Sequence, residues 1–382
     1  MTSSTDFFAE FPPVSKEDWL QQVAKDLKGK PLEELNWRLS DDFLVSPFVH
    51  ADDFPAPPPP LSTQPNRWEI CESVVVADPI AANRQSLEAL QGGAWGLQFE
   101  FETSPSFEVL SQVLEGIYID FIGLHFAGQG IQQNPGIVLA HLERLARARE
   151  LPTESLRGSL AYDPVASASI VDWRYLADLI DHAQRIFPQF KIIAISPKPT
   201  ETEDPLQLSM LPALLRTGNH YLEKLSERGV LPAQTFAAMQ FCIPIGKSYF
   251  FEIARLRAFK LLWVNVLKAW SITLAQPAVS AFFRPEAYSD DLYTNMIRAT
   301  TMSMSAVLGG AERLTVLPYD AGREAMTAYP QSFSRRIARN VQHLLKMESG
   351  FDELSDPAAG SFYIETLTQQ LSERAWAEFA SV

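Results

Sequence analysis

From Arg67 onward the chain alternates short apolar, strand-like runs with longer runs in which apolar residues recur at helical spacing. In the run near the C-terminus, for example, Phe333, Ile337, Val341 and Leu345 form one apolar stripe. Such alternation predicts parallel β/α units. The strand candidates are Trp68–Val76, Gly96–Phe101, Tyr118–His125, Arg157–Tyr162, Lys191–Ser196, Ala237–Ile243, Ala278–Phe283 and Arg313–Leu317.

These eight units predict an α/β fold, a (β/α)8 TIM barrel over residues 66–382. The helical stretches between the strands include Ile80–Leu90, Asp172–Phe187 and Ser248–Trp270. A doubly wound open sheet is the alternative architecture. It usually has fewer strands and often a Gly-rich first turn, which this sequence lacks.

Residues 1–65 are predicted to form an N-terminal arm that ends in a Pro-rich linker. A helix is expected over Lys16–Leu27 with Ser15 as its cap, and the seven prolines of Ser46–Pro65 indicate a stiff spacer. The arm has too little mass for a core of its own, so its aromatic rings fold onto the barrel or wrap around a partner; we favour the partner. These rings are Phe7, Phe8, Phe11, Trp19 and Trp37.

The net charge of −14 argues against nucleic acid or an anionic membrane surface as the main partner, because both require clustered Lys and Arg. The sequence has no signal-peptide pattern and no apolar run approaching the roughly 20 residues that span a bilayer. A cytoplasmic protein is therefore expected. Cys71 and Cys242 lie in apolar runs and are expected to be buried, reduced thiols rather than a disulfide or a metal site.

Three polar positions near predicted strand ends are candidate functional residues. His125 precedes Gly128–Gly130, where a tight turn is favoured over a phosphate-binding loop because a third glycine is missing. Asp163 precedes a proline, so a turn that caps the next helix is favoured over a catalytic carboxylate. Glu100 shares its strand face with Gln98 and Glu102, which predicts an acidic character at this end of the barrel.

Four segments carry a resemblance to the barrel domain of the methylmalonyl-CoA mutase family. They are AWGLQFE (Ala94–Glu100), IGKSYFFEIARLRAFKLLW (Ile245–Trp263), YTNMIRAT (Tyr293–Thr300), and the spaced RIARN-Q, ESG and DP--GS-Y-E-LT residues within Arg336–Thr368. The resemblance covers about residues 68–380 and is strongest from Gly246 onward. It implies a barrel whose active site lies at the C-terminal ends of the strands.

The resemblance also implies where catalytic residues should stand, and these positions have changed. Catalytic members carry a Tyr and a His after the fifth strand, and the His hydrogen-bonds the thioester carbonyl. Here those positions are Lys198 and Pro199, and proline has no side-chain donor. The polar stretches after the seventh and eighth strands are also lost. The family's cobalt-ligating D-x-H-x-x-G motif is absent from these residues, so we expect no cobalamin-binding domain, no bound cofactor or metal, and no catalytic residue.

The chain therefore resembles the small, non-catalytic subunit of heterodimeric members of this family. The implied partner is a large catalytic subunit, and the implied reaction of the complex interconverts succinyl-CoA and methylmalonyl-CoA with adenosylcobalamin. A divergent mutase barrel that works with a separate cobalamin-binding subunit is one alternative. A barrel that only binds acyl-CoA is another, with Lys198 and Arg284 as its substrate-binding cations.

Overall fold

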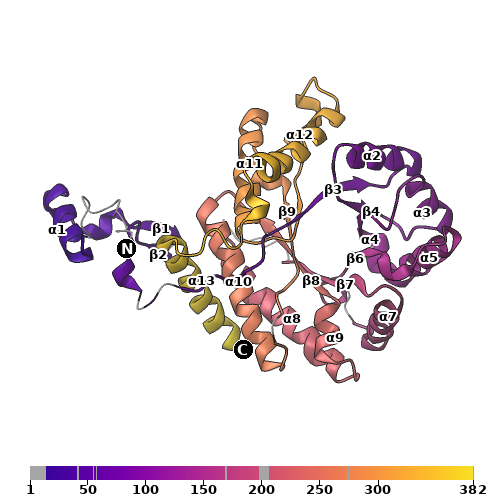
Figure 1. Cartoon of the computed structure of the whole chain (residues 1–382), viewed down its shortest axis with the longest axis horizontal. Helices are drawn as coiled ribbons and strands as arrows, with labels where there is room; N and C mark the ends of the chain where they lie inside the picture. Colours follow the sequence, from indigo (N-terminus) through magenta and orange to yellow (C-terminus); the bar gives the residue numbers. More distant parts are fainter. Residues whose placement is uncertain are drawn as a thin grey trace, which may run out of the picture.

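The chain folds into a closed barrel of eight parallel strands in the order β10-β3-β4-β5-β6-β7-β8-β9 (Figure 1). The computed structural model describes residues 14–40, 43–54, 56, 58–167, 170–197, 206–273 and 275–381. Closure of the sheet confirms the predicted TIM barrel and excludes the open sheet. The barrel strands are β3 (Glu69–Val75), β4 (Gly96–Glu100), β5 (Gly123–Ala127), β6 (Arg157–Tyr162), β7 (Gln189–Ile195), β8 (Met239–Ile245), β9 (Val279–Phe283) and β10 (Arg313–Thr315).

Helices surround the barrel on its outside (Figure 1). Among the described residues, no helix combines the length and the apolar character that a membrane crossing requires. The helices are α1 (Lys16–Asp26), α2 (Pro79–Gln91), α3 (Phe107–Val113), α4 (Gln129–Gln133), α5 (Pro135–Ala148), α6 (Pro164–Ser167), α7 (Trp173–Ile186), α8 (Met210–Ser226), α9 (Pro232–Ala237), α10 (Tyr249–Ala269), α11 (Leu292–Leu308), α12 (Gln331–His343) and α13 (Phe362–Ala380).

The predicted strand Tyr118–His125 is wrong in its first half, because β5 begins only at Gly123. The residues before it form a turn, in which the backbone N–H of Phe121 donates to the carbonyl oxygen of Tyr118 at 3.2 Å. Both rings face solvent, with 77% of Tyr118 and 72% of Phe121 exposed. Their apolar character therefore reflects an exposed aromatic turn rather than a buried strand.

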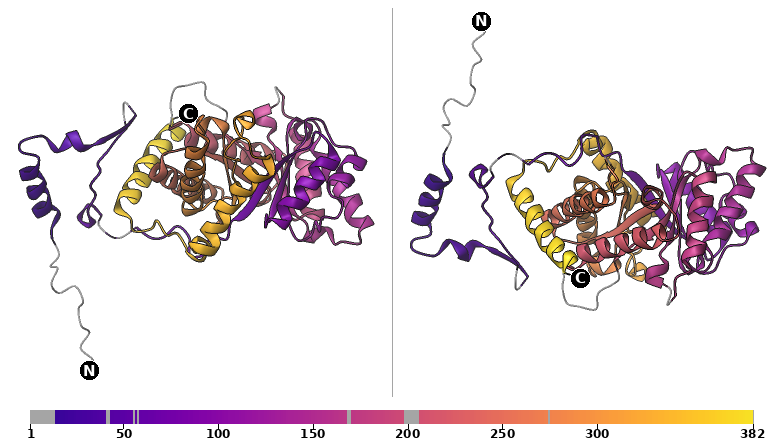
Figure 2. Two further views of the ribbon diagram at one scale, coloured as in Figure 1. Left: turned by 90° about the horizontal axis from the view of Figure 1, so that it is seen from above. Right: turned by 90° about the horizontal axis from the view of Figure 1, so that it is seen from below.

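The described part of residues 14–60 lies to one side of the barrel, beside α13 (Figure 2). The predicted cap is confirmed, because the Ser15 hydroxyl accepts a hydrogen bond from the backbone N–H of Asp18 at 3.1 Å. An antiparallel hairpin, β1 (Trp37–Ser40) and β2 (Phe43–Val45), follows. One ring of this segment, Phe54, stacks on Phe362 of α13 with centroids 5.5 Å apart.

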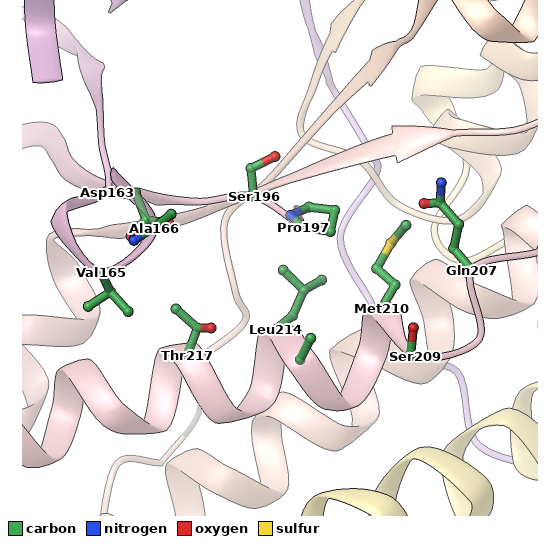
Figure 3. A pocket seen from close by; sticks show the side chains of 11 residues that line it. Asp163, Val165, Ala166, Ser196, Pro197, Gln207, Ser209, Met210, Leu214 and Thr217 are labelled. Atoms are coloured by element: carbon green, nitrogen blue, oxygen red, sulfur yellow. The ribbon is translucent and has the colours of Figure 1, made fainter. Parts of the chain in front are cut away.

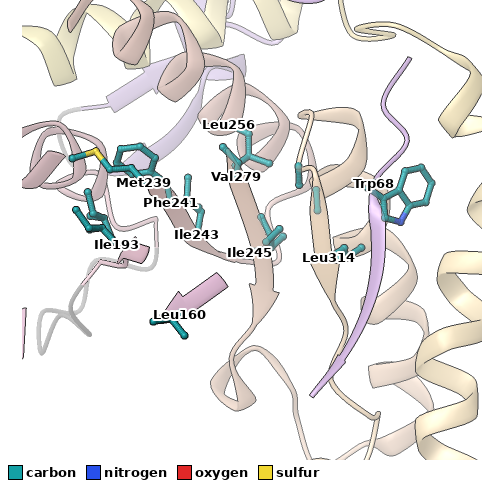
Figure 4. Packing of buried hydrophobic residues seen from close by; sticks show 14 of the residues in the cluster. Trp68, Leu160, Ile193, Met239, Phe241, Ile243, Ile245, Leu256, Val279 and Leu314 are labelled. Carbon is teal, nitrogen blue, oxygen red and sulfur yellow. The ribbon is translucent and has the colours of Figure 1, made fainter. Parts of the chain in front are cut away.

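The main core lies between the outer face of the barrel and the helices, because outward-pointing strand residues are large and apolar (Figure 4). Phe241 of β8 packs against Phe259 and Trp263 of α10, with ring centroids 4.7 and 4.8 Å apart. Each fully buried side chain of this size stabilises the fold by about 1.5–3 kcal/mol. This core holds the strand ends, and therefore the site they form, in fixed positions.

A buried cluster of charges joins α10 to the C-terminal segment. The guanidinium of Arg257 is paired with the Asp356 carboxylate and, at 2.7 Å, with that of Glu365. The Asp356 carboxylate also accepts a hydrogen bond at 2.7 Å from the backbone N–H of Leu61 in the Pro-rich linker. The guanidinium thus joins two segments in which the family resemblance is strongest, and Asp356 links the Pro-rich linker to them.

The inside of the barrel is polar near the N-terminal ends of the strands. Arg313 donates from Nε to the Ser280 hydroxyl at 2.8 Å, and its NH1 group contacts Nδ1 of His125. The other ring nitrogen, Nε2, lies 2.7 Å from the Glu69 carboxylate. Burial, and then the charge of Arg313, lower the pKa of His125 to about 4. The imidazole is therefore neutral at pH 7, accepting from Arg313 and donating to Glu69.

Replacing Arg257 by methionine is expected to lower the free energy of unfolding by about 3–5 kcal/mol, because two buried carboxylates lose their counter-charge. Urea denaturation measures the change. The matched control is R147M, which removes an exposed arginine paired with Glu143 on the same helix and should cost under about 1 kcal/mol. Equal losses in the two variants would contradict the stabilising role of the buried cluster.

His125 makes stability depend on pH in a defined direction. Its folded pKa is below the ordinary value of 6.5, so the unfolded chain binds the proton more readily and stability falls as pH drops from 6.5 towards 4. The loss should be on the order of 3 kcal/mol, and H125Q should show a correspondingly smaller loss. Urea denaturation at pH 7, 5.5 and 4.5 tests this, with H182Q, at a partly exposed histidine, as the control. Parallel pH profiles for H125Q and the wild type would refute it.

Candidate functional site

The C-terminal ends of the strands surround a cavity of about 990 Å³, which we call the mouth cavity. This is the end at which barrel enzymes place their active sites. Most of its polar groups are hydroxyls and amides. Its lining residues are Ser73, Gln98, Glu100, Gln129, Gln132, Ala161, Asp163, Ala166, Ser167, Ala194, Ser196, Pro197, Cys242, Ser280, Phe282, Phe283, Arg284, Thr315 and Leu317.

The two carboxylates of the mouth cavity are engaged by neighbouring protein groups. Glu100 accepts hydrogen bonds from the Ser73 hydroxyl at 2.5 Å and from the Gln98 amide at 3.4 Å. Asp163 accepts from the Tyr221 hydroxyl at 2.6 Å and from the backbone N–H of Ala166 at 3.1 Å. The prediction of Asp163 as a helix-capping residue is thus confirmed. Glu100 lies at the mouth as predicted, whereas Glu102 is exposed and is not among the described residues that line the cavity. Glu100 and Asp163 are held as acceptors rather than as free bases.

Arg284 is the single basic side chain among the described residues that line the mouth cavity. It is half-buried at the end of β9, and its NH2 group donates to the carbonyl oxygen of Pro197 at 3.0 Å. This bond ties the ends of β9 and β7 together. The other two predicted positions of interest, Lys198 and Pro199, lie outside the described residues.

A smaller apolar slot of about 240 Å³ opens beside the mouth cavity, between the ends of β6 and β7 and helix α8 (Figure 3). Val165, Leu214 and Met210 provide its apolar walls, and Pro197 lies at the end of β7 above them (Figure 3). Asp163, Ala166, Ser196 and Pro197 line both spaces. The slot therefore extends the mouth cavity with an apolar compartment, and its described lining adds no titratable group beyond Asp163.

The cysteines are unsuited to catalysis as they stand. Cys71 and Cys242 are free, and Cys242 lines the mouth cavity. Burial raises the pKa of both thiols, to about 12 for Cys71, so the reactive thiolate is disfavoured. The prediction of two reduced thiols is confirmed, although Cys242 is only partly buried.

One group of side chains has the spacing of a metal site but the wrong surroundings. Ligand atoms of Glu69, Cys71 and His125 lie within 4.8 Å of one another. However, Arg313 contacts Nδ1 of His125, and Glu69 lies against its other nitrogen. A cation placed there would face a guanidinium and a protonated thiol. The arrangement is better explained as a hydrogen-bonded network that fills the barrel.

Sequence reasoning placed His125 near a possible ligand loop and missed its real partner, Arg313, 188 residues away. A usable signal exists in the alternation of the strands. Along β3, the inward positions Glu69, Cys71 and Ser73 alternate with Ile70 and the other outward residues. Polar residues at alternate positions, rather than the branched apolar residues usual inside such barrels, mark a polar interior.

Comparison with known proteins agrees with this architecture. The family model of methylmalonyl-CoA mutase matches residues 105–382. The small subunit of this mutase from Porphyromonas gingivalis is 32% identical over 98% of this chain and 64% of its own length, and that from Streptomyces virginiae is 28% identical over the same shares. The large subunit from Streptomyces virginiae is 29% identical over 72% of this chain and 38% of its own length.

The chain thus spans 64% of the length of both small-subunit relatives. The family match covers well over half of the chain, including the helix that carries Arg257 and the segment that carries Asp356 and Glu365. Sequence motifs, barrel and family model all agree. The chain belongs to the methylmalonyl-CoA mutase family.

Proposed function

We propose that this chain acts as the small, non-catalytic subunit of a methylmalonyl-CoA mutase, paired with a large catalytic subunit. In such a complex succinyl-CoA and methylmalonyl-CoA are interconverted, and adenosylcobalamin supplies the radical chemistry. The likeness to two small subunits over 98% of the chain supports this role. The observation that carries it is the replacement of the family's catalytic Tyr and His by Lys198 and Pro199.

The state of the mouth cavity supports the same conclusion. Its carboxylates, on Glu100 and Asp163, are occupied by hydrogen bonds from Ser73 and Tyr221. A general base must instead be free to accept a proton from its substrate. The described lining offers hydroxyls, amides and one arginine, which suit binding or packing better than proton transfer.

The residues present do not fit a cobalamin ligand set. The D-x-H-x-x-G motif is absent from the 382 residues, and none of the six histidines is among the described residues that line the mouth cavity. His125, the buried one in the barrel, is held by Glu69 and Arg313 towards the opposite end. We therefore assign no cobalt ligand to this chain and no catalytic step to its residues.

The N-terminal arm is our candidate for part of the subunit interface. No described residue of α1 is buried, and 63% of Trp37 and 48% of Leu44 are exposed on the hairpin. The arm projects beside α13 rather than covering the barrel (Figure 2). Exposed aromatic and aliphatic side chains on a projecting segment are typical of surfaces that become buried by a partner.

Acyl-CoA binding without catalysis is the second candidate function. Arg284 lines both the mouth cavity and a neighbouring space of about 610 Å³, so part of its guanidinium is available to an anionic ligand. Lys198 follows the adjacent strand end in sequence. Titration calorimetry with succinyl-CoA on the isolated chain tests this function, and the absence of measurable heat would reject it.

Co-expression with the cognate large subunit is expected to give a 1:1 complex by light scattering coupled to gel filtration. W37A should weaken that complex by about tenfold or more, because central aromatic side chains dominate binding energy. The matched control is Y118A, which removes an even more exposed ring from the turn after α3. That turn follows α3, on the far side of the barrel from the arm (Figure 1).

The proposal fails if the large subunit is fully stable and active alone and never binds this chain. The role of the arm fails separately if the complex forms but W37A and Y118A bind with the affinity of the wild type.

A further inference from the structure

A second, polar cavity of about 330 Å³ lies at the N-terminal end of the barrel, opposite the mouth cavity; we call it the basal pit. First residues of the strands and the residues just before them form its wall. Neither the proposed subunit role nor acyl-CoA binding at the mouth cavity involves the basal pit. The charged and amide side chains that line it include Glu69, Arg157, Lys191, Gln240, Glu312 and Arg313.

The basal pit contains a buried hydrogen-bond donor that lacks an acceptor. Gln240 is only 5% exposed, and its Nε2 group is fully buried without a hydrogen-bond partner. Leaving a buried amide unpaired costs about 1–3 kcal/mol. Such groups are rare in folded proteins and often mark the place of a bound water, ion or ligand.

Cations outnumber carboxylates in the basal pit, although the whole chain carries a net charge of −14. Arg157, Lys191 and Arg313 are positive, whereas Glu69 and Glu312 are negative. The two carboxylates offset part of this positive charge, because Glu69 lies near Arg313 and Arg157, and Glu312 lies near Lys191. One positive charge remains in excess. Glu69 lies 2.7 Å from Nε2 of His125, and Glu312 lies 3.9 Å from Nζ of Lys260, a further cation beside the pit.

Two of these cations have N–H groups that can donate further hydrogen bonds. Arg157 is exposed, and its NH2 group donates to the carbonyl oxygen of Phe121 at 2.8 Å. Lys191 donates to the carbonyl oxygen of Ala237 at 2.8 Å, and burial lowers its pKa, which means that the ammonium is incompletely compensated. Each group has further N–H bonds to offer.

We propose that the basal pit binds a small oxyanion, either free phosphate or the phosphate group of a larger ligand. Phosphate oxygens would accept from Arg157 and Lys191 and would neutralise the excess positive charge. The buried amide of Gln240 would turn towards the pit and donate a further hydrogen bond. The site is separate from the mouth cavity and does not depend on the proposed subunit role. Glu69 lies near Arg157 and Glu312 lies near Lys191, so the two carboxylates limit the affinity.

Thermal unfolding and titration calorimetry of the full chain with inorganic phosphate test the proposal. Phosphate should raise the melting temperature saturably, beyond sodium chloride at equal ionic strength. R157Q and Q240M should each weaken phosphate binding by about tenfold or more, because each removes a donor to the anion. The control is R174Q, at an exposed arginine on α7 outside the pit, which should bind as the wild type does.

Q240M has a second expected effect that keeps the test decisive if R157Q fails to fold. Removing the unpaired amide should leave stability without phosphate unchanged or raised, while the phosphate response falls. Ribose 5-phosphate separates the two sources: competition with phosphate indicates a phosphoester ligand, and its failure to bind indicates the free ion. A phosphate response no larger than that of chloride, or one retained in Q240M and in folded R157Q, would overturn the proposal.

Discussion

The ion pairs of Arg257 with Asp356 and Glu365 hold together the parts of the chain that identify its family. One guanidinium fixes α10, the turn after α12 and the start of α13, and the same Asp356 carboxylate anchors the Pro-rich linker at Leu61. A buried pair of this kind is costly to break from one side, so all members must persist together. This requirement explains why the motifs around these residues stay recognisable while the strand ends have changed.

A second buried pair repeats this arrangement further along the barrel wall, between α12 and β3. Arg339 of α12 pairs with Glu72, which points outward from β3, and Arg335 approaches the same carboxylate at 3.5 Å. Outer helices are thus fixed to the barrel by charges as well as by apolar packing. The wall of the barrel is therefore held rigidly by its exterior. Its interior is free to vary, and there small and polar side chains leave a mouth cavity at one end and a basal pit at the other.

The division between exterior and interior bears directly on function. A barrel whose outer helices keep the family pattern can present the family's surfaces to a partner whatever happens at the strand ends. At the mouth, Asp163 caps α6 and accepts a hydrogen bond from Tyr221. This carboxylate therefore has a structural role at a strand end, where barrel enzymes place catalytic groups. With Pro199 at the position that the resemblance gives to the family's catalytic His, this structural use of Asp163 supports the proposed role of a partner subunit.

Strand alternation and helical spacing predicted the fold well, because both patterns depend only on residues close together in the sequence. The bounds of β6 were predicted to the residue, whereas β5 was started early because Tyr118 and Phe121 are apolar yet lie in a turn. Side-chain partners were not predictable in this way. Arg313 meets His125 across 188 residues, and nothing in either neighbourhood encodes that contact. The positions of Glu100 and Asp163 at the mouth were predictable because they follow from strand ends alone.

The most direct test of the account is the turnover number of the reconstituted heterodimer when only the mouth cavity of this chain is altered. A combined A166W and R284A variant narrows the cavity and removes its basic side chain, at positions that are exposed and half-buried. The account predicts a kcat within about twofold of the wild-type complex. A loss of about tenfold or more in an intact complex would place catalysis in this chain and contradict it.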